Sequence, residues 1–123
     1  MAPFTPGQIV VADWRDAVPR EPNKLRPAIV VEDSSLFGPT YPNVILVPLT
    51  QDHNLAVADL SVSIEPTPEN GCTKRCYALS LAVVSTSKRR VRPTRSHVTP
   101  EQLKTIREQI ATAIGLGRRS TSF

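Results

Sequence analysis

The stretch from Leu25 to Asp52, LRPAIVVEDSSLFGPTYPNVILVPLTQD, contains two runs typical of β-strands. Pro27 to Val31 and Asn43 to Thr50 are rich in β-branched and aliphatic residues, and turn-forming residues separate them. If the two strands pair antiparallel, the start of the first and the end of the second lie at one edge of the sheet. Arg26 and Thr50 would then converge there, and a cation beside a hydroxyl suits the binding of a phosphate.

The length of 123 residues is enough for one domain with a modest core. We expect residues 7–116 to form this domain, residues 1–6 to be a loose lead-in and residues 117–123 to be a flexible tail. No apolar run approaches the length of about 18 residues that spans a membrane, and no signal peptide is visible. We therefore expect a cytoplasmic protein that has no membrane partner. The formal net charge of +4 is compatible with a nucleic-acid partner.

The remaining strands and one helix are predicted from residue patterns. Strands are expected at 8–14 and 58–65, and residues 76–86 are expected to form a further strand or a bent pair. Thr99 is a good helix N-cap, and Gln102 completes a capping box with it. Apolar residues then recur at helical spacing, at Leu103, Ile106, Ile110 and Ile114.

Metal and cofactor sites are not indicated. Cys72 and Cys76 are too few for a disulfide framework, and we expect free thiols in a reducing cytosol. Only His53 and His97 could complete a zinc site with them, and these histidines lie in different contexts. The chain lacks GxxxxGK[ST], GxGxxG and HExxH motifs. We predict no metal and no cofactor.

Several residues are candidates for contacts with nucleic acid, each with a simpler alternative. Trp14 is either a core or rim aromatic or a platform for base stacking. The cations of the loop at 15–25 contact phosphates or are merely solvated, and His53 touches substrate or lies on the surface. The basic run at 87–95 is either a solvated face or a holder of a phosphate backbone. The full set of candidate RNA contacts is Trp14, Arg15, Arg20, Lys24, Gln51, Lys74, Arg75, Lys88 and Arg89.

Several of these motifs, in this order, resemble the PemK/MazF family of toxin endoribonucleases. The matching pieces are Gly7 to Asp13, Leu25 to Val31 and Val44 to Thr50. Gly71 leading into Cys76–Leu79, then Val83 to Lys88, and the terminal helix match more weakly. Together they cover about residues 7 to 116, and the Arg-Pro strand followed by a strand ending in Pro-Leu-Thr is fairly specific as a pair.

The resemblance implies a mainly β fold, a small SH3-like, PemK-type β-barrel with a C-terminal α-helix, working as a homodimer. It also implies the toxin of a type II toxin–antitoxin system, which cleaves single-stranded RNA at short sequences without a metal and so inhibits translation and growth. A flexible segment of a cognate antitoxin would occupy the RNA groove. The catalytic arginine and threonine of the family correspond to Arg26 and Thr50.

The chemistry implied by the resemblance fits these residue types. Attack by the 2′-hydroxyl of the RNA gives a 2′,3′-cyclic phosphate and a 5′-hydroxyl. A guanidinium offers planar, paired donors for the phosphoryl oxygens, and a hydroxyl adds one more donor. Arginine is a poor base at neutral pH, so His53, whose reference pKa is about 6.5, is the candidate for proton transfer.

Departures from the family pattern leave an alternative function open. Val84 stands where many relatives carry an arginine, Leu81 and Ala82 stand where some carry an acidic or amide residue, and Cys76 replaces a common serine. The alternative is a non-catalytic barrel module, either a degenerate toxin or a protein-targeting relative similar to a gyrase poison. An unrelated small β-domain is the third possibility. The first two differ in whether Arg26 and Thr50 face a shared open groove.

Two alternatives also remain for the proposed pair itself. Arg26 could instead form an ion pair with Glu32 or Asp33, and Thr50 could serve only as a turn-forming hydroxyl.

Overall fold

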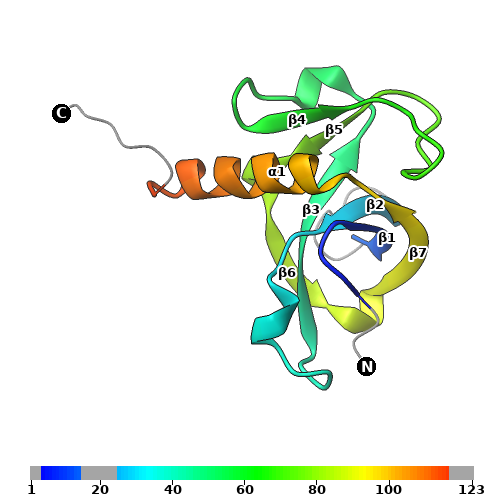
Figure 1. The fold of residues 1–123 in the computed structure, drawn as a ribbon, viewed down its shortest axis with the longest axis vertical. Helices are drawn as coiled ribbons and strands as arrows, with labels where there is room; N and C mark the ends of the chain where they lie inside the picture. The colour runs from blue at the N-terminus through cyan, green and yellow to red at the C-terminus, as the bar shows by residue number, and fades with distance from the viewer. Residues whose placement is uncertain (1–3, 15–24, 117–123) are drawn as a thin grey trace.

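The computed structural model describes residues 4–14 and 25–116 (Figure 1). The strands are β1 (Gln8–Asp13), β2 (Leu25–Val30), β3 (Asn43–Thr50), β4 (Ser61–Ile64), β5 (Cys76–Leu79), β6 (Val84–Ser87) and β7 (Val91–His97). The helix is α1 (Pro100–Ala113), and the 3₁₀ turns are η1 (Ser34–Leu36), η2 (His53–Leu55), η3 (Ser80–Ala82) and η4 (Lys88–Arg90). The expected tail at 117–123 and the loop residues Arg15, Arg20 and Lys24 lie outside the described residues.

All seven strands belong to one antiparallel sheet in which β3 is the central strand. The order is β4-β5-β3-β2-β1-β7, and β6 also pairs with β3. One edge of β3 pairs with β2, while the other edge pairs first with β6 and then with β5. The sheet is strongly curved and bends back on itself, and α1 lies beside it (Figure 1). The expected mainly β fold with a C-terminal helix is confirmed.

The alternation of side chains along the strands produces two apolar cores. Ile9 and Ile29 point into the cluster that also holds Leu103 and Ile106 of α1. Their neighbours Val10 and Ala28 point into a second cluster on the opposite face. Each large aliphatic side chain that is fully buried contributes about 1.5–3 kcal/mol, so both faces of the sheet stabilise the fold.

The helix begins as the sequence predicts and ends one residue short of the predicted apolar stripe. Thr99 and Gln102 form the expected capping box. At the other end, the Gly115 N–H donates to the Thr112 carbonyl and the Leu116 N–H to the Ala111 carbonyl, a Schellman arrangement that Gly115 allows at φ 93°. The interpretation of Ile114 as a packing residue was wrong, because the side chain lies past the last helical turn and is 67% exposed.

Two other expectations need correction, and one strand was missed. The lead-in is not loose from Phe4 onward, because Phe4 is buried in the second cluster and the Thr5 N–H donates to the Gln8 side chain. The strand expected at 58–65 starts only at Ser61, since Asp59 adopts φ 68° in the preceding turn. Strand β7 was not predicted, because its sequence is polar and contains a proline. The bent pair expected at 76–86 is observed as β5, η3 and β6.

Candidate functional site

Arg26 and Thr50 lie where the ladder between β2 and β3 ends. The paired residues run from Val30↔Leu46 to Ala28↔Pro48. Continuing this register by two residues places Arg26 opposite Thr50, on the same face of the sheet. Beyond Pro48, β3 is paired on its other edge with β5, where Thr50 is the partner of Tyr77. The strand ends therefore frame a gap between Arg26 and Thr50.

This gap is a small open pocket. Its volume is about 180 Å³, and its lining residues are Arg26, Pro27, Leu49, Thr50, Gln51 and Cys76. Arg26 is exposed and Thr50 is half-buried, so both are accessible from solvent. Three of the predicted site residues, Arg26, Thr50 and Gln51, therefore share one pocket. His53 is exposed in η2 and is not among the lining residues.

Thr50 has a local structural bond that still permits a role in the pocket. Its Oγ1 accepts the Asp52 N–H at 3.1 Å, and the Asp52 carboxylate accepts the Asn54 N–H at 2.9 Å. The turn-forming alternative for Thr50 is thus correct in part. A hydroxyl that accepts one bond keeps its hydrogen for donation, and within the described residues no acceptor of that hydrogen is found. The turn therefore fixes the position of Thr50 Oγ1 and leaves the hydroxyl hydrogen of Thr50 available to a ligand.

The alternative ion pair of Arg26 with Glu32 or Asp33 is wrong. Six residues of extended chain separate Arg26 from Glu32, which is on the order of 20 Å and too far for a side-chain contact. Glu32 is buried and accepts bonds from Ser34 Oγ and the Ile45 N–H. Hydrogen bonds from Ser35 lower the pKa of Asp33, and the nearby Arg107 charge acts in the same direction.

The segment that leads into β5 holds Lys74, Arg75 and the two cysteines. Lys74 is exposed, whereas Arg75 forms an ion pair with Glu65, so its guanidinium is engaged within the protein. A hydrogen bond to Tyr77, and to a smaller extent one to Glu65, raises the pKa of Arg75. Both cysteines are free thiols.

Cys72 and Cys76 lie in different surroundings. Cys76 is buried and lines the pocket, where its Sγ donates to the Lys74 carbonyl. Cys72 packs against the first core cluster, to which Cys76 belongs. Burial, followed by a hydrogen bond and a charge interaction with Cys76, raises the pKa of Cys72 to about 11.

Trp14 and the basic run lie on other parts of the surface. Trp14 is half-buried against the second core cluster, which includes Ala12, the partner of Arg26 in β1. This packing supports the rim-aromatic interpretation and leaves part of the ring exposed. The cations of the basic run lie in different places. Arg89, Arg90 and Arg92 line a second pocket of about 620 Å³. Arg95 lines a different hollow near the start of α1. Lys88 lines neither.

Sequence reasoning missed the apolar half of the Arg26 pocket. Pro27, Leu49 and Cys76 line it, and of the four departures from the family pattern only Cys76 does so. Leu81 and Ala82 belong to η3, where Leu81 is 55% exposed, and Val84 pairs with Leu46 at the start of β6. No local signal marks Leu49 as a lining residue, because its position depends on the end of the β2–β3 ladder.

Two searches of the described residues gave negative results. Residues 4–14 and 25–116 contain no cluster of three or more His, Cys, Asp or Glu side chains that could hold a metal ion. The same part of the chain has no helix long and apolar enough to cross a membrane.

Comparison with known proteins places the chain in a family. The profile of the PemK-like, MazF-like toxins of type II toxin–antitoxin systems matches residues 5–114. The chain therefore belongs to this toxin family, as its motifs predicted. The comparison with curated proteins gave no significant match.

Solved structures share the fold at low sequence identity. An endoribonuclease in complex with its cognate antitoxin from a mycobacterial species is 22% identical, with a TM-score of 0.70 over 94% of this chain and 97% of that one. MazF from Deinococcus radiodurans is 19% identical, with a TM-score of 0.73 over 94% and 99% of the two chains. A MazE–MazF structure from the same organism is 16% identical, with a TM-score of 0.65 over 94% and 98%.

Proposed function

We propose that this toxin is an endoribonuclease that cleaves single-stranded RNA at the Arg26 pocket without a metal ion. The observation that carries the proposal is the shared, open pocket that holds both Arg26 and Thr50. The sequence left open whether these two residues face a shared open groove or are buried apart, and the pocket that both of them line supports the first possibility. Solved structures with the same fold include endoribonucleases, which supports the activity.

The substrate supplies its own nucleophile in this reaction. The 2′-hydroxyl attacks the adjacent phosphorus, the bond to the 5′-oxygen breaks, and the products are a 2′,3′-cyclic phosphate and a 5′-hydroxyl. Negative charge grows on the non-bridging oxygens as the attack proceeds. The Arg26 guanidinium donates to these oxygens in a planar, paired geometry, and the Thr50 hydroxyl donates one more bond. Donors fixed in this way stabilise the transition state without reorganisation.

The proton transfers need a group other than Arg26. A guanidinium stays protonated at neutral pH, so the role of Arg26 is electrostatic. His53 follows Thr50 by three residues, lies in the exposed turn η2 and is the candidate base. Gln51 lines the pocket. The other proposed RNA contacts are Trp14, Lys74, Arg75, Lys88 and Arg89, together with Arg15, Arg20 and Lys24.

The proposed partners follow from the family. A cognate antitoxin would cover the RNA groove of a cytoplasmic homodimer, and release from it would inhibit translation and growth. The likeness to a MazE–MazF structure and to an endoribonuclease–antitoxin complex supports an antitoxin partner.

A non-catalytic binding module is the second candidate function. The observation that favours it is the apolar remainder of the pocket, Pro27, Leu49 and Cys76. Among the described residues, no charged or amide side chain lines the pocket beyond Arg26 and Gln51. Such a module would bind its target through the same barrel without cleaving RNA.

One assay separates these functions. Purified protein free of antitoxin is incubated with a long single-stranded RNA in EDTA, and the ends of the products are mapped. We expect cuts at a short recurring sequence, with 5′-hydroxyl ends that accept phosphate from a kinase and with 2′,3′-cyclic phosphates. Products with 5′-phosphates would contradict the mechanism. The absence of any cleavage by folded protein would favour the binding module.

A further inference from the structure

The two cysteines of the chain, Cys72 and Cys76, lie together at the edge of the Arg26 pocket. Both are free thiols. Cys76 belongs to the first core cluster, Cys72 packs against that cluster, and a hydrogen bond joins the two thiols. Cys76 also lines the Arg26 pocket, whereas Cys72 does not. The pocket therefore has a pair of adjacent thiols in its wall, for which the proposed cleavage reaction has no use.

A hydrogen-bonded turn fixes Cys72 beside the pocket. The buried Asn70 side chain accepts the Thr67 N–H at 3.0 Å and the Cys72 N–H at 2.9 Å. The same side chain donates to the Glu65 carbonyl at 2.8 Å. These three bonds close the turn between β4 and β5, so the backbone of Cys72 is held from within its own turn.

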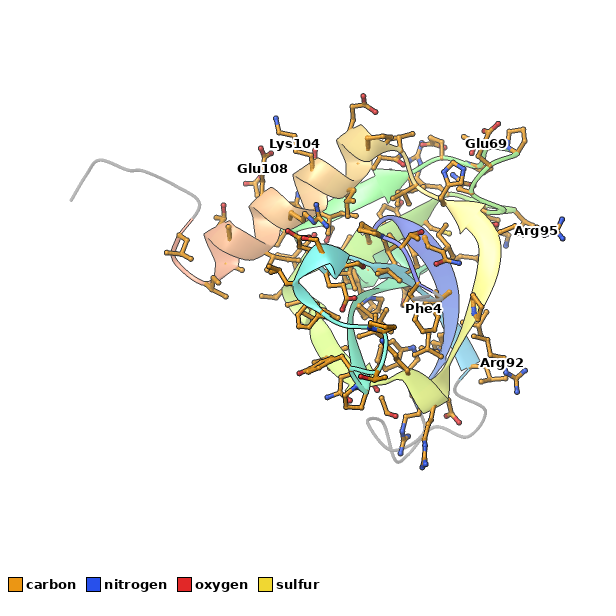
Figure 2. All side chains as sticks on the ribbon, turned by 60° about the horizontal axis from the view of Figure 1, so that its bottom comes forward. Phe4, Glu69, Arg92, Arg95, Lys104 and Glu108 are labelled. Carbon is orange, nitrogen blue, oxygen red and sulfur yellow. The ribbon has the colours of Figure 1, made fainter. Side chains whose placement is uncertain are left out.

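The neighbouring strands hold the turn and Cys76 in place. The His97 N–H of β7 donates to the Glu69 carbonyl at 2.9 Å, and Glu69 lies at the outer surface beside the end of β7 (Figure 2). Cys76 begins β5 and pairs with Ile64 of β4. Both cysteines therefore sit on hydrogen-bonded backbone, and their contact does not depend on a loosely held segment.

The surroundings of the pair suit a disulfide better than a thiolate. Burial is the main reason that the pKa of Cys72 is raised to about 11, since a charged sulfur is costly there. A disulfide carries neither a charge nor an S–H donor. The bonds that the thiols make to backbone carbonyls are weak, at 3.9 Å from Cys72 and 3.4 Å from Cys76, so little is lost when the hydrogens leave.

We infer that Cys72 and Cys76 form a modification site, at which a low-molecular-weight disulfide produces an intramolecular disulfide that changes the lining of the Arg26 pocket. The thiolate of Cys72, the more exposed of the two residues, attacks the external disulfide, and one thiol leaves. The Cys76 thiolate then attacks the Cys72 sulfur of the mixed disulfide, and the second thiol leaves. The two cysteine protons pass to the released thiols, so the pair is oxidised by two electrons and the external disulfide is reduced.

Closure of this disulfide reaches the pocket through Cys76. Its Sγ loses the hydrogen that it donates to the Lys74 carbonyl and takes its position from Cys72 instead. The next residue, Tyr77, is the strand partner of Thr50, so a shift at Cys76 is passed to the pocket wall. The formation of the disulfide needs no RNA. Only its effect on cleavage, which we expect to be inhibitory, rests on the proposed function.

Mass spectrometry after incubation of the folded protein with oxidised glutathione tests the site itself. We expect the intact wild type to lose two hydrogens and to regain them in dithiothreitol. Trypsin cuts between the cysteines, after Lys74 or Arg75, so the link should join two peptides. The control variants Cys72→Ser and Cys72→Ala should not form this product. A lasting glutathione adduct on the wild type, or links between molecules only, would overturn the site.

Methyl NMR tests whether closure changes the pocket. Leu49 lines the Arg26 pocket, and Leu46 of the same strand points into the second core cluster and serves as the internal control. Oxidation should shift the methyl signals of Leu49 and leave those of Leu46 in place, and Cys72→Ser should show neither shift. A closed disulfide with unmoved Leu49 signals would overturn the effect on the pocket.

Cleavage rates separate this inference from the proposed function. The oxidised wild type should cleave RNA several-fold more slowly than the reduced form and should recover in dithiothreitol. Cys72→Ser should cleave equally well with and without oxidised glutathione. If neither redox form cleaves RNA, the proposed function fails, while disulfide formation with a Leu49 shift still supports the site. If both forms cleave at the same rate, the proposed function stands and the inhibitory effect of closure is refuted.

Discussion

Arg26 and Thr50 face each other across the end of the β2–β3 ladder and line one pocket. The ladder stops at Ala28↔Pro48, so the two strands keep their register and leave the space between their ends open. Arg26 and Thr50 therefore both line an open pocket of about 180 Å³. This shared pocket is the observation that favours the proposed catalytic site over two separate structural residues.

The hydroxyl of Thr50 should matter more for cleavage than for stability. Thr50→Val keeps the shape of the side chain and removes both the donor to the phosphate and the acceptor of the Asp52 N–H. We expect kcat/KM on RNA to fall about a hundredfold. Thr50→Ser keeps the hydroxyl and should stay close to the wild type. Thermal unfolding serves as the control, since the lost bond to Asp52 costs only about 1 kcal/mol. Equal activity of the two variants would remove Thr50 from the mechanism.

The Cys72 thiol should react slowly with alkylating agents. Its pKa of about 11, against an ordinary 9.0, leaves roughly a hundredfold less thiolate at neutral pH, and the thiolate is the reactive form. Peptide-resolved mass spectrometry after iodoacetamide treatment should show alkylation that accelerates as pH rises toward 11. Labelling as fast as in the unfolded chain would contradict the raised pKa.

The same shift predicts how stability depends on pH. The folded-state pKa lies above the unfolded one, so the folded protein binds more protons than the unfolded chain between about 9 and about 11. The stability that the neutral thiol contributes is fully present below about 9 and is lost as pH rises through about 11. Cys72→Ser should remove this component of the pH dependence.

Gly71 should tolerate no side chain. It adopts φ 68°, and a Cβ built on it would lie 2.6 Å from Ser96 Oγ of β7. Just beside it, the His97 N–H donates to the Glu69 carbonyl at 2.9 Å and ties this turn to the edge strand. Gly71→Ala should therefore lower the free energy of unfolding by about 1–3 kcal/mol. Gly38→Ala is the matched control, because nothing lies within 4 Å of a Cβ there. Equal denaturation midpoints would show that the turn relaxes.

Local patterns in the sequence predicted the elements that carry the site. The β-branched run placed β3 at Asn43–Thr50, the bounds that the structure shows. The cap at Thr99 was also predictable, since a capping box involves neighbouring residues only. Antiparallel geometry then sufficed to bring Arg26 and Thr50 to one edge of the sheet.

Features that depend on distant partners could not be predicted. The polar strand β7 pairs with Val10 to Ala12 of β1, and its own residues, which include three charged or imidazole side chains and a proline, give only a weak β signal. Arg75 pairs with Glu65 across the β4–β5 hairpin, which a charge count cannot foresee. Cys76 joins the pocket because β5 pairs with the end of β3. The assignment of the RNA-contacting residues stays a prediction.

The most direct measurement is the cleavage of a long single-stranded RNA in EDTA by the wild type, Arg26→Ala and Arg26→Lys. Arg26 is exposed, so the variants should unfold at nearly the same temperature as the wild type. We predict that Arg26→Ala lowers the rate by about a hundredfold to a thousandfold, and that Arg26→Lys recovers only part of it, because an ammonium lacks the planar paired donors. Cleavage by Arg26→Ala at the wild-type rate, at the same sequence and with the same ends, would place the active site elsewhere and contradict this account.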